Sequence, residues 1–414
     1  GKVSRKQRDA AHMAAGRRPR HIFRIAALCL SALLLTGASA VVFLYLGLNA
    51  RQHPQESDPS KPSKKNSSMN VLIIGSDYRN GESDVDGAGS TGEVAGMRSD
   101  TTMLMHISAD RKRVEVVSIP RDTLVDIPEC NVRDKDEKVL YTTEPQENTR
   151  FNSAFAKGGA KLNAGSAANC TMRTVEKLTG YKVHIDNYMV INFAAFKSIV
   201  TQLGGVPAYF EDDVDDKEAG LKVKAGCRLL NGDQALALAR ARKTFGDGSD
   251  LGRVNRQQEL VKTIISEAMD LDLFSDSVKL YRIAKGTMKN IDTNEGFGDV
   301  ENLVSLASSL QDVAPNDVKF LTMPFKHKGA YVVQRDEASK LWKNIADDKP
   351  VKMTVDPAEG TVTDADSPSQ APASAGGSAE NAAKESPASP EASQSAKPSP
   401  SSKKTPVCTR NNAK

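Results

Sequence analysis

The feature that most constrains this chain is a run without any charged side chain, from Ile25 to Ala50. As an α-helix, these residues would extend about 39 Å, which exceeds the roughly 30 Å of a bilayer's hydrocarbon core. Residues 1–24 are basic, and basic residues flank the cytoplasmic side of a membrane span. We therefore expect a cytoplasmic segment over 1–24, a single transmembrane helix over 25–50, and an extracytoplasmic remainder. A cleaved signal peptide is the alternative, but the run is long for one and its small residues lie in its middle.

The charge balance is uneven along the chain. Lys and Arg number 56 against 52 Asp and Glu, and residues 1–24 contribute eight of the basic residues and one acid. The other 390 residues therefore carry 48 − 51 = −3, which excludes a uniformly basic nucleic-acid-binding protein. We expect a partner other than nucleic acid.

Composition divides the extracytoplasmic part into three segments. Residues 51–68 form a polar stalk, and residues 69–355 have the composition of one folded domain. Residues 356–414 form a tail rich in Pro, Ser and Ala. Within it, 33 of the 50 residues at 357–406 are Pro, Ser, Ala or Gly. Such a segment buries too little apolar surface to offset the entropy of ordering, so we predict a disordered tail.

The cysteines favour two disulfides. Cys130, Cys170, Cys227 and Cys408 make an even number in a segment expected outside the cell, where disulfides persist. Four cysteines allow three pairings. We favour Cys130 with Cys170, the nearest in sequence, which leaves Cys227 with Cys408 and ties the tail to the domain. A zinc site is the competing interpretation, but the chain has no C-x-x-C and no His at ligand spacing.

Hydrophobic periodicity predicts strands alternating with helices. The predicted strands are 70–75, 101–107, 114–119, 188–191 and 318–322. The predicted helices are 150–157, 165–178, 193–202, 233–242, 257–269 and 301–310. This order is typical of the α/β class, with a central mixed β-sheet sandwiched by helices.

Acids and arginines gather where these predicted elements begin and end. They are Asp77, Arg98, Asp100, Arg121, Asp122, Arg240, Arg242, Asp250 and Arg253, followed by Gln257. Each has a structural alternative as a turn former, a dipole partner or a surface ion pair. Together they suit phosphate, because Arg binds phosphate in a bidentate manner and carboxylates near phosphates suit Mg²⁺. Without a nucleophile beside a His, the pattern favours phosphoryl transfer by positioning and charge stabilisation.

Six blocks in one order make the chain resemble the LytR-CpsA-Psr family of membrane-anchored enzymes of Gram-positive bacteria. The blocks are VLIIGSD, MRSDTTMLMHIS, VVSIPRDTLVDIP, RFNSAFAKGG, LNGDQALALARAR and DLGRVNRQQELVK, within residues 69–345. The resemblance implies transfer of a glycopolymer from an undecaprenyl-pyrophosphate carrier to peptidoglycan or to a glycoprotein, with a phosphodiester as product. It also implies a groove for the polyprenyl chain in an α/β sheet sandwiched by helices.

The resemblance also implies roles, carried over motif by motif. Asp77 and Asp100 would bind Mg²⁺. The pyrophosphate would be contacted by Arg98, Arg121, Arg240, Arg242, Arg253 and Gln257. The residues expected to be catalytic are Arg121, Arg242, Asp100 and Asp250, and either acid would take the acceptor's proton. Asp122 is expected to hold its loop.

Two other functions stay open. A pyrophosphatase would only hydrolyse the lipid carrier, whereas an envelope scaffold would need no catalytic acids or arginines. One apolar stripe fits either the polyprenyl groove or an ordinary core: Phe193, Phe196, Ile199, Val200 and Leu203. The sequence does not identify the glycopolymer, the acceptor or the oligomeric state.

Overall fold

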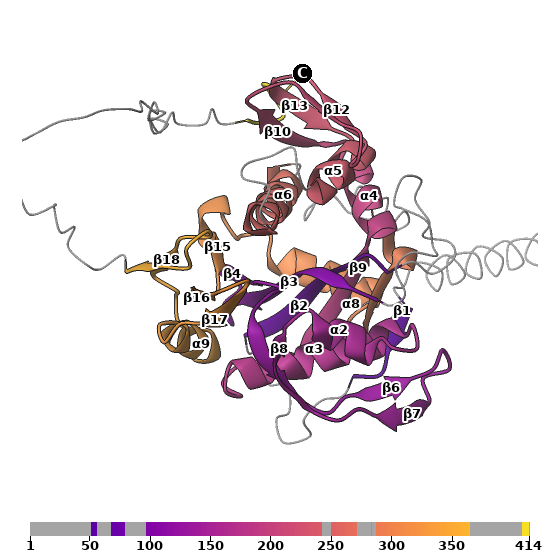
Figure 1. The fold of residues 1–414 in the computed structure, drawn as a ribbon. Helices are drawn as coiled ribbons and strands as arrows, with labels where there is room; N and C mark the ends of the chain where they lie inside the picture. Colours follow the sequence, from indigo (N-terminus) through magenta and orange to yellow (C-terminus); the bar gives the residue numbers. More distant parts are fainter. Residues whose placement is uncertain are drawn as a thin grey trace, which may run out of the picture. The chain divides into compact units, whose positions relative to one another are not determined.

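The largest sheet has seven strands in the order β1-β14-β9-β2-β3-β4-β15 (Figure 1). The computed structural model describes residues 51–55, 68–78, 97–241, 250–270, 283, 287–364 and 408–413. The strands, in sheet order, are β1 (Arg51–His53), β14 (Ile291–Asn294), β9 (Asn187–Asn192), β2 (Met69–Ser76), β3 (Ser99–Ile107), β4 (Val114–Ile119) and β15 (Val318–Thr322). Three pairs are parallel, β1 with β14, β9 with β2 and β4 with β15, and β3 is antiparallel to both neighbours. The predicted mixed sheet is confirmed.

Helices cover both faces of this sheet. On one face, Leu72 and Leu104 share a core with Val175 of α3 (Ala164–Leu178), which packs beside α2 (Ser153–Gly158). On the other face, Met103 and Val116 pack with residues of α6 (Asp250–Asp270) and α8 (Val300–Ser309). Successive side chains of a strand point to opposite faces, so an apolar strand such as β3 serves both cores. The predicted sandwich of helices around the sheet is therefore confirmed.

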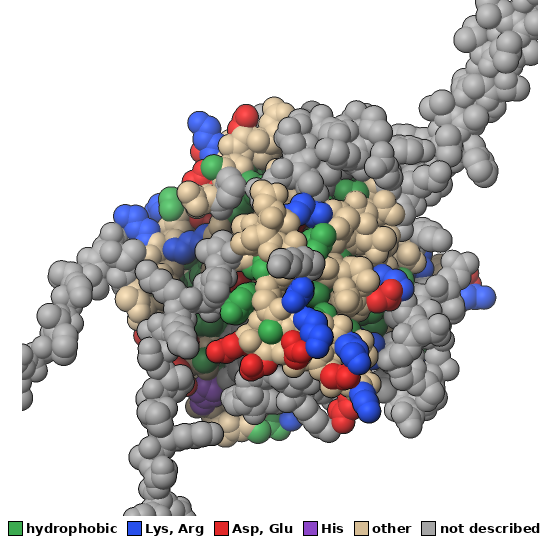
Figure 2. Space-filling model, turned by 90° about the horizontal axis from the view of Figure 1, so that it is seen from above, with side chains coloured by type: hydrophobic (Ala, Val, Ile, Leu, Met, Phe, Trp, Pro, Cys, Tyr) green, Lys and Arg blue, Asp and Glu red, His purple; other side chains and the backbone are tan. Residues whose placement is uncertain are grey.

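A second, smaller core joins three helices to two hairpins. Its elements are α4 (Phe193–Gln202), α5 (Gly232–Arg240), β10 (Val206–Phe210), β11 (Val214–Asp216), β12 (Leu221–Val223) and β13 (Gly226–Leu230), together with Leu260 of α6. Val200 and Leu203 of the predicted apolar stripe are buried in this core, and Phe196 and Ile199 pack against it partly buried. Figure 2 views this side of the molecule and shows acidic and basic side chains interspersed; Lys222–Asp215 and Lys224–Asp213 are ion pairs of these hairpins.

Short elements complete the domain and were not predicted. They are β5 (Leu124–Ile127), β6 (Asn131–Arg133), β7 (Val139–Thr142), β8 (Gln146–Arg150), β16 (Phe325–Lys328), β17 (Tyr331–Gln334), α9 (Ala338–Ala346), β18 (Met353–Val355) and β19 (Val362–Asp364), with the 3₁₀ turns η3 (Met288–Asn290) and η4 (Pro315–Asp317). They pair as hairpins β5–β8, β6–β7, β16–β17 and β18–β19.

Three predicted boundaries differ from the structure by more than two residues. The helix predicted over 150–157 begins at Ser153, because Arg150 is still paired in β8. The helix predicted over 257–269 begins at Asp250, since Gly252 did not interrupt it. The domain boundary predicted at 355 falls inside a hairpin, because Val355 pairs with Val362.

Several predicted segments lie outside the described residues. They are residues 1–50, most of the stalk, and residues 365–407 of the tail. In the part of the chain that is described, no helix combines the length and the apolar character needed to cross a membrane.

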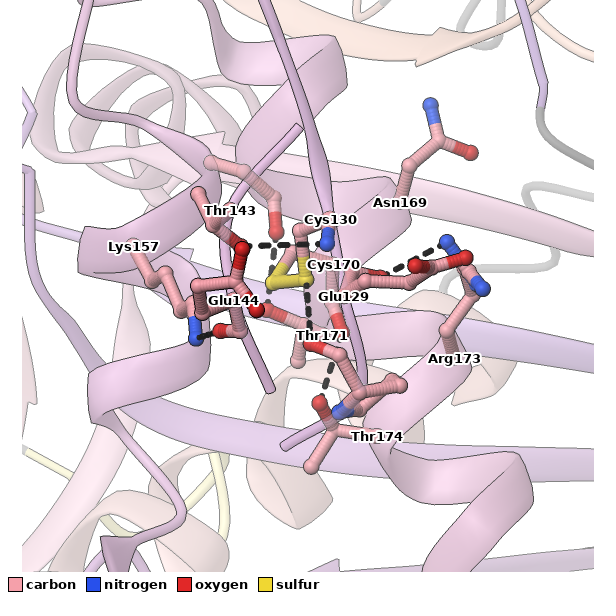
Figure 3. Close-up of a disulfide and its surroundings, with 12 residues drawn as sticks. Glu129, Cys130, Thr143, Glu144, Lys157, Asn169, Cys170, Thr171, Arg173 and Thr174 are labelled. Carbon is pink, nitrogen blue, oxygen red and sulfur yellow. Dashed lines mark hydrogen bonds between the residues drawn. A yellow bond between two sulfur atoms is a disulfide. The ribbon is translucent and has the colours of Figure 1, made fainter. Parts of the chain in front are cut away.

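Both predicted disulfides are formed. Cys130 bonds Cys170 with the Cα atoms 5.3 Å apart, and Cys227 bonds Cys408 with the Cα atoms 5.5 Å apart. Figure 3 shows the first bridge beside Thr143, whose hydroxyl oxygen accepts a hydrogen bond from the Cys130 N–H. Because all four thiols are used in disulfides, they do not supply thiolate ligands for zinc.

Candidate active site

The register of the large sheet brings several predicted site residues to one edge. Ser76, at the end of β2, lies beside both Asn192 at the end of β9 and Ser99 at the start of β3. Thr102 of β3 pairs with Ile119 of β4, so the same antiparallel register, continued outward, sets Asp100 opposite Arg121. Carboxylates and guanidinium groups from separate loops therefore meet where these strands end.

Arg121 is held by two acids. Its Nη1 donates to Asp100 Oδ1 at 2.9 Å, and its Nε donates to Asp122 Oδ2 at 3.3 Å. The backbone carbonyl of Asp122 also accepts from the Val332 N–H, which ties this loop to β17. These contacts fix the plane of the Arg121 guanidinium while the side chain stays partly exposed.

Asp77 and Arg98 are joined through the backbone. Asp77 Oδ1 accepts from the Arg98 N–H at 3.0 Å, and the Arg98 carbonyl accepts from both the Asp77 N–H and the Ser76 hydroxyl. The β2–β3 register shifts between Gly75 and Ser76, so Ser76 pairs with Ser99. This shift brings the backbones of Asp77 and Arg98 together. The contacts hold the main chain of Arg98 in place and leave its side chain exposed.

Two helices bring further residues to the same edge. The Arg240 guanidinium, at the end of α5, lies 5.7 Å from the ring centroid of Phe193, the first residue of α4. Gln257 of α6 uses both ends of its amide: Oε1 accepts from the Thr101 hydroxyl, and Nε2 donates to the Ala239 carbonyl at 3.2 Å. Gln257 therefore connects β3, α5 and α6.

The remaining predicted site residues are only partly within the described structure. Arg242 lies outside the described residues. Asp250 and Arg253 belong to the backbone of α6, but their side chains are not among those described. Positions 250, 253 and 257 have the spacing that places residues on one side of a helix.

Two residues at this edge were missed by the sequence reasoning. Arg150 has its Nε 3.7 Å from Asp122 Oδ1 and its guanidinium 5.0 Å from the Tyr331 ring centroid. Its position in the RFNSAFAKGG block was the available signal. Asn192 is 2% exposed and caps α4 through Oδ1, and its Nδ2 is a buried donor without a partner among the described residues. Its sequence signal was only that of a helix cap.

The acids at this edge fit Mg²⁺ in part. Mg²⁺ is usually bound by one or two carboxylates and completes its shell with phosphate oxygens and water, and Asp77 and Asp100 supply two carboxylates. Across the described ranges, no group of three or more His, Cys, Asp or Glu side chains is placed to hold a metal. The donor set therefore suits a cation that arrives with a phosphate ligand.

Comparison with known proteins identifies similar sequences and folds. The model of the LytR_cpsA_psr family matches residues 41–347. TagT of Bacillus subtilis, named a polyisoprenyl-teichoic acid–peptidoglycan teichoic acid transferase, is 30% identical over 283 residues, which cover 66% of this chain and 73% of TagT. LcpB of Corynebacterium glutamicum, a probable cell wall biosynthesis protein, is 26% identical over 284 residues, covering 68% of this chain and 61% of LcpB.

The coverage of some relatives is lower, and the solved structures support the fold. TagV of Bacillus subtilis is 30% identical over 202 residues, which cover 48% of this chain and 45% of TagV. The chain thus spans less than two thirds of LcpB and of TagV. A LytR-Csp2A-Psr enzyme from Actinomyces oris has a TM-score of 0.50 at 20% identity, covering 72% of this chain and 96% of that chain. This likeness shows a shared fold.

Proposed function

The chain belongs to the LytR-CpsA-Psr family, and from that premise we propose that it is a phosphotransferase acting on a lipid-linked glycopolymer. The donor is a glycopolymer on an undecaprenyl-pyrophosphate carrier, and the acceptor is peptidoglycan or a glycoprotein. The observation that carries the proposal is the meeting of Asp77, Asp100 and Arg121 at one sheet edge. Support also comes from TagT and TagV, which are named as teichoic acid transferases to peptidoglycan.

The reaction exchanges one phosphorus–oxygen bond for another. An acceptor hydroxyl oxygen bonds to the phosphorus nearer the sugar, and the bond from that phosphorus to the bridging oxygen breaks. Polyprenyl phosphate leaves with the electron pair, and the hydroxyl proton passes to a carboxylate. Asp100 and Asp250 are the two candidate bases. The product is a phosphodiester between glycopolymer and acceptor.

The arginines stabilise the charge that develops on the phosphates. Arg121 suits this role because Asp100 and Asp122 hold its guanidinium before substrate arrives, and a preorganised donor needs no reorganisation during reaction. Arg98 offers an exposed guanidinium on a fixed backbone. We assign Arg240, Arg242 and Arg253 to the same charge cluster.

Gln257 has a more structural part in this proposal than the sequence implied. Its amide is engaged by Thr101 and by the Ala239 carbonyl, so it fixes α6 against β3 and α5. This contact positions the N-terminal part of α6, which carries Asp250 and Arg253, over the sheet edge. A change at Gln257 would therefore act on the site through the placement of α6.

Mg²⁺ would be held by Asp77 and Asp100, where it would neutralise charge on the pyrophosphate. Asp77 Oδ1 also accepts a hydrogen bond from the Arg98 N–H. The same carboxylate would therefore bind the metal and position the backbone of Arg98.

We further propose that residues 25–50 anchor the chain in the cell membrane, with residues 1–24 in the cytoplasm and the catalytic domain outside. The uncharged run and its basic flank support this orientation. The two disulfides fit an oxidising compartment.

The test is transfer by the full-length chain in lipid nanodiscs. The donor is a polyprenyl-pyrophosphate-linked oligosaccharide, the acceptor is a soluble peptidoglycan fragment, and each reaction runs with Mg²⁺ or with EDTA. The expected result is a covalent adduct, detected by mass spectrometry, that depends on Mg²⁺. Arg121→Lys should lower the rate by about 10²-fold or more, because Lys cannot reproduce the fork held by two acids.

Arg113→Lys is the matched control. Arg113 lies at the opposite end of β4, where it pairs with Glu115, so the same chemical change there should leave transfer intact. Hydrolysis of the donor to polyprenyl phosphate and oligosaccharide phosphate, without an adduct, would replace the transferase with a pyrophosphatase. Equal activity of Arg121→Lys and Arg113→Lys would remove Arg121 from the mechanism.

A further inference from the structure

The hairpin β6–β7 exposes apolar side chains that the domain itself does not cover. Val139, Leu140 and Tyr141 are 40%, 46% and 44% exposed, and Leu162, in the turn between α2 and α3, is 56% exposed. All residues of β7 are exposed, so both faces of this strand are open. Val139, Leu140 and Tyr141 are consecutive in β7, and Leu162 lies near the hairpin turn; these four exposed apolar side chains are called the apolar patch below.

The hairpin is firmly held at its base, so it presents this patch in a fixed position. The Cys130–Cys170 bridge joins the chain just before β6 to α3. The Arg133 N–H donates to the Ser166 hydroxyl at 3.0 Å, and the Arg133 guanidinium donates to the Glu137 carbonyl at 2.8 Å across the turn. Asn163, the cap of α3, donates to the Asp134 carbonyl at 2.7 Å, which places Leu162 beside the hairpin turn.

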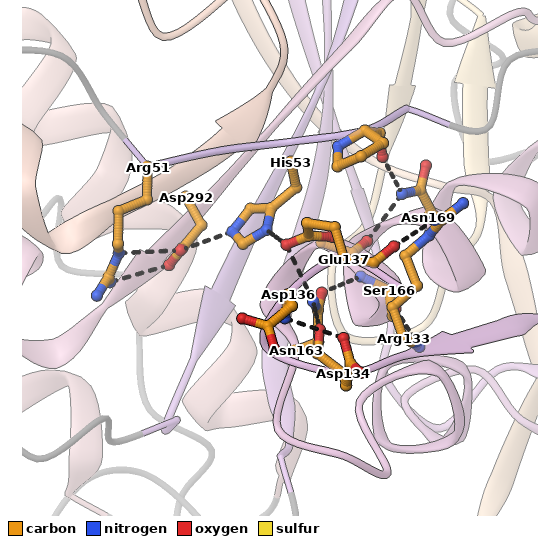
Figure 4. Close-up of polar contacts among 12 residues, drawn as sticks. Arg51, His53, Arg133, Asp134, Asp136, Glu137, Asn163, Ser166, Asn169 and Asp292 are labelled. Carbon is orange, nitrogen blue, oxygen red and sulfur yellow. Dashed lines mark hydrogen bonds and ion pairs between the residues drawn. The ribbon is translucent and has the colours of Figure 1, made fainter. Parts of the chain in front are cut away.

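The hairpin turn is also bound to the strand that follows the uncharged run. His53 of β1 has Nδ1 2.6 Å from Glu137 Oε1 and Nε2 2.9 Å from Asp292 Oδ1 (Figure 4). The uncharged run ends at Ala50, three residues before His53, which corresponds to about 11 Å of extended chain at most. Val139 follows Glu137 by two residues. The apolar patch is thus held near the point where the chain leaves the proposed membrane span.

The residues around the patch have the chemistry of a membrane interface. The exposed Lys135, Lys138 and Lys161 flank it, with Asp136 and Glu144 as opposing exposed charges. Lys side chains extend their charges to lipid head groups while their stems lie along apolar surface, and Tyr is enriched at that depth.

We propose that the hairpin β6–β7, together with Leu162, is a docking surface for the bilayer in which the chain is anchored. This inference rests on the membrane anchoring given under the proposed function. Val139, Leu140, Tyr141 and Leu162 enter the interfacial layer, and the flanking lysines contact anionic head groups. The span and the hairpin then make two separate contacts with the membrane. Two contacts fix the rotation of the domain about its anchor, which sets the direction of the active site relative to a lipid-linked donor.

Tryptophan quenching tests this docking in the full-length chain. The chain has one tryptophan, Trp342, which is buried and gives a constant background. Leu140→Trp adds a second indole in the patch, and Tyr181→Trp adds one at an exposed position beyond the far end of α3. The variants are reconstituted into vesicles of phosphatidylcholine and phosphatidylglycerol with brominated or unbrominated acyl chains. We expect brominated lipid to remove most of the added emission of Leu140→Trp and none of that of Tyr181→Trp.

The outcomes separate docking from anchoring. Flotation of the vesicles first shows whether the chain is anchored. Flotation with equal emission of Leu140→Trp in both lipids overturns docking and leaves the proposed function standing. Equal quenching of Leu140→Trp and Tyr181→Trp also overturns it, because it shows no preferred face. If the chain does not float with the vesicles, both the proposed anchoring and the proposed docking are wrong.

Discussion

Arg410, in the short C-terminal segment joined by the Cys227–Cys408 bridge, is expected to be a major stabilising residue. Its Nε donates to Glu267 Oε2 at 2.7 Å, and its two terminal nitrogens donate to three backbone carbonyls. The three carbonyls, just after α4, are those of Leu203, Gly204 and Gly205. Glu267, on α6, is only 5% exposed. Arg410→Ala would leave a buried carboxylate and these carbonyls without their donor.

The free energy of unfolding lost in Arg410→Ala depends on how deeply each side chain of the ion pair is buried. Removing one partner of a fully buried pair costs about 3–5 kcal/mol. The Arg410 side chain is 30% exposed, so solvent screens part of this interaction and we expect about 2–3 kcal/mol. Detachment of residues 408–413 would let water reach Glu267, and the free energy of that detachment sets an upper limit on the loss. For a domain of this size, the melting temperature should fall by roughly 4–10 °C.

Thermal unfolding of the full-length chain in detergent measures this loss under non-reducing conditions. Lys224→Ala is the matched control, because Lys224 lies three residues before Cys227 and its ion pair with Asp213 is on the surface. It should leave the melting temperature unchanged. Glu267→Gln combined with Arg410→Ala should destabilise by less than the sum of the two single changes, because no unpaired charge remains.

Two results would refute this reasoning. If Arg410→Ala and the wild type had the same melting temperature, the ion pair with Glu267 would contribute little to stability. Strictly additive single changes would show that the two side chains do not interact energetically, whatever their distance.

Three further predictions concern the opposite side of the domain. Replacing Cys130 and Cys170 by Ala should cost about 4 kcal/mol in urea unfolding, because the bridge closes a segment of 40 residues. Burial lowers the pKa of His53, but hydrogen bonds and charges of two acids outweigh it and raise that pKa above 6.5. His53→Gln should therefore destabilise most below pH 6.5, with the difference fading as pH rises through the folded-state pKa, as melting at several pH values can check. Gly158→Ala should lower the melting temperature, because its Cβ would lie 2.3 Å from the Ser166 carbonyl oxygen.

Continuous apolar strands and amphipathic helices were predictable because their pattern depends on residues near in sequence. The predicted bounds of β4, α4 and β15 agree with the structure. Strands β6, β7, β10 and β13 were missed because runs of three to five residues are too short to show a clear period of two, and their pairing depends on tertiary context. Helix α9 was missed although its Leu341 and Trp342 are buried in the main core.

The candidate site shows the same division. Residues that follow a strand were expected at its end, and the register then set Asp100 opposite Arg121. The partners of Gln257 could not be foreseen, since Thr101 and Ala239 reach it only through the packing of α6 on β3 and α5. The sequence indicated only that Asn192 could cap a helix. That its Nδ2 is buried without a partner among the described residues could be learned only from the structure.

The Cys227–Cys408 bridge changes how the Pro- and Ser-rich segment relates to the domain. The segment of 43 residues from 365 to 407 has one end at β19 and the other at Cys408, and both ends belong to the domain. While the bridge is intact, both ends of this segment are therefore attached to the domain, and reduction of Cys227 and Cys408 would leave only the end at β19 covalently attached to it.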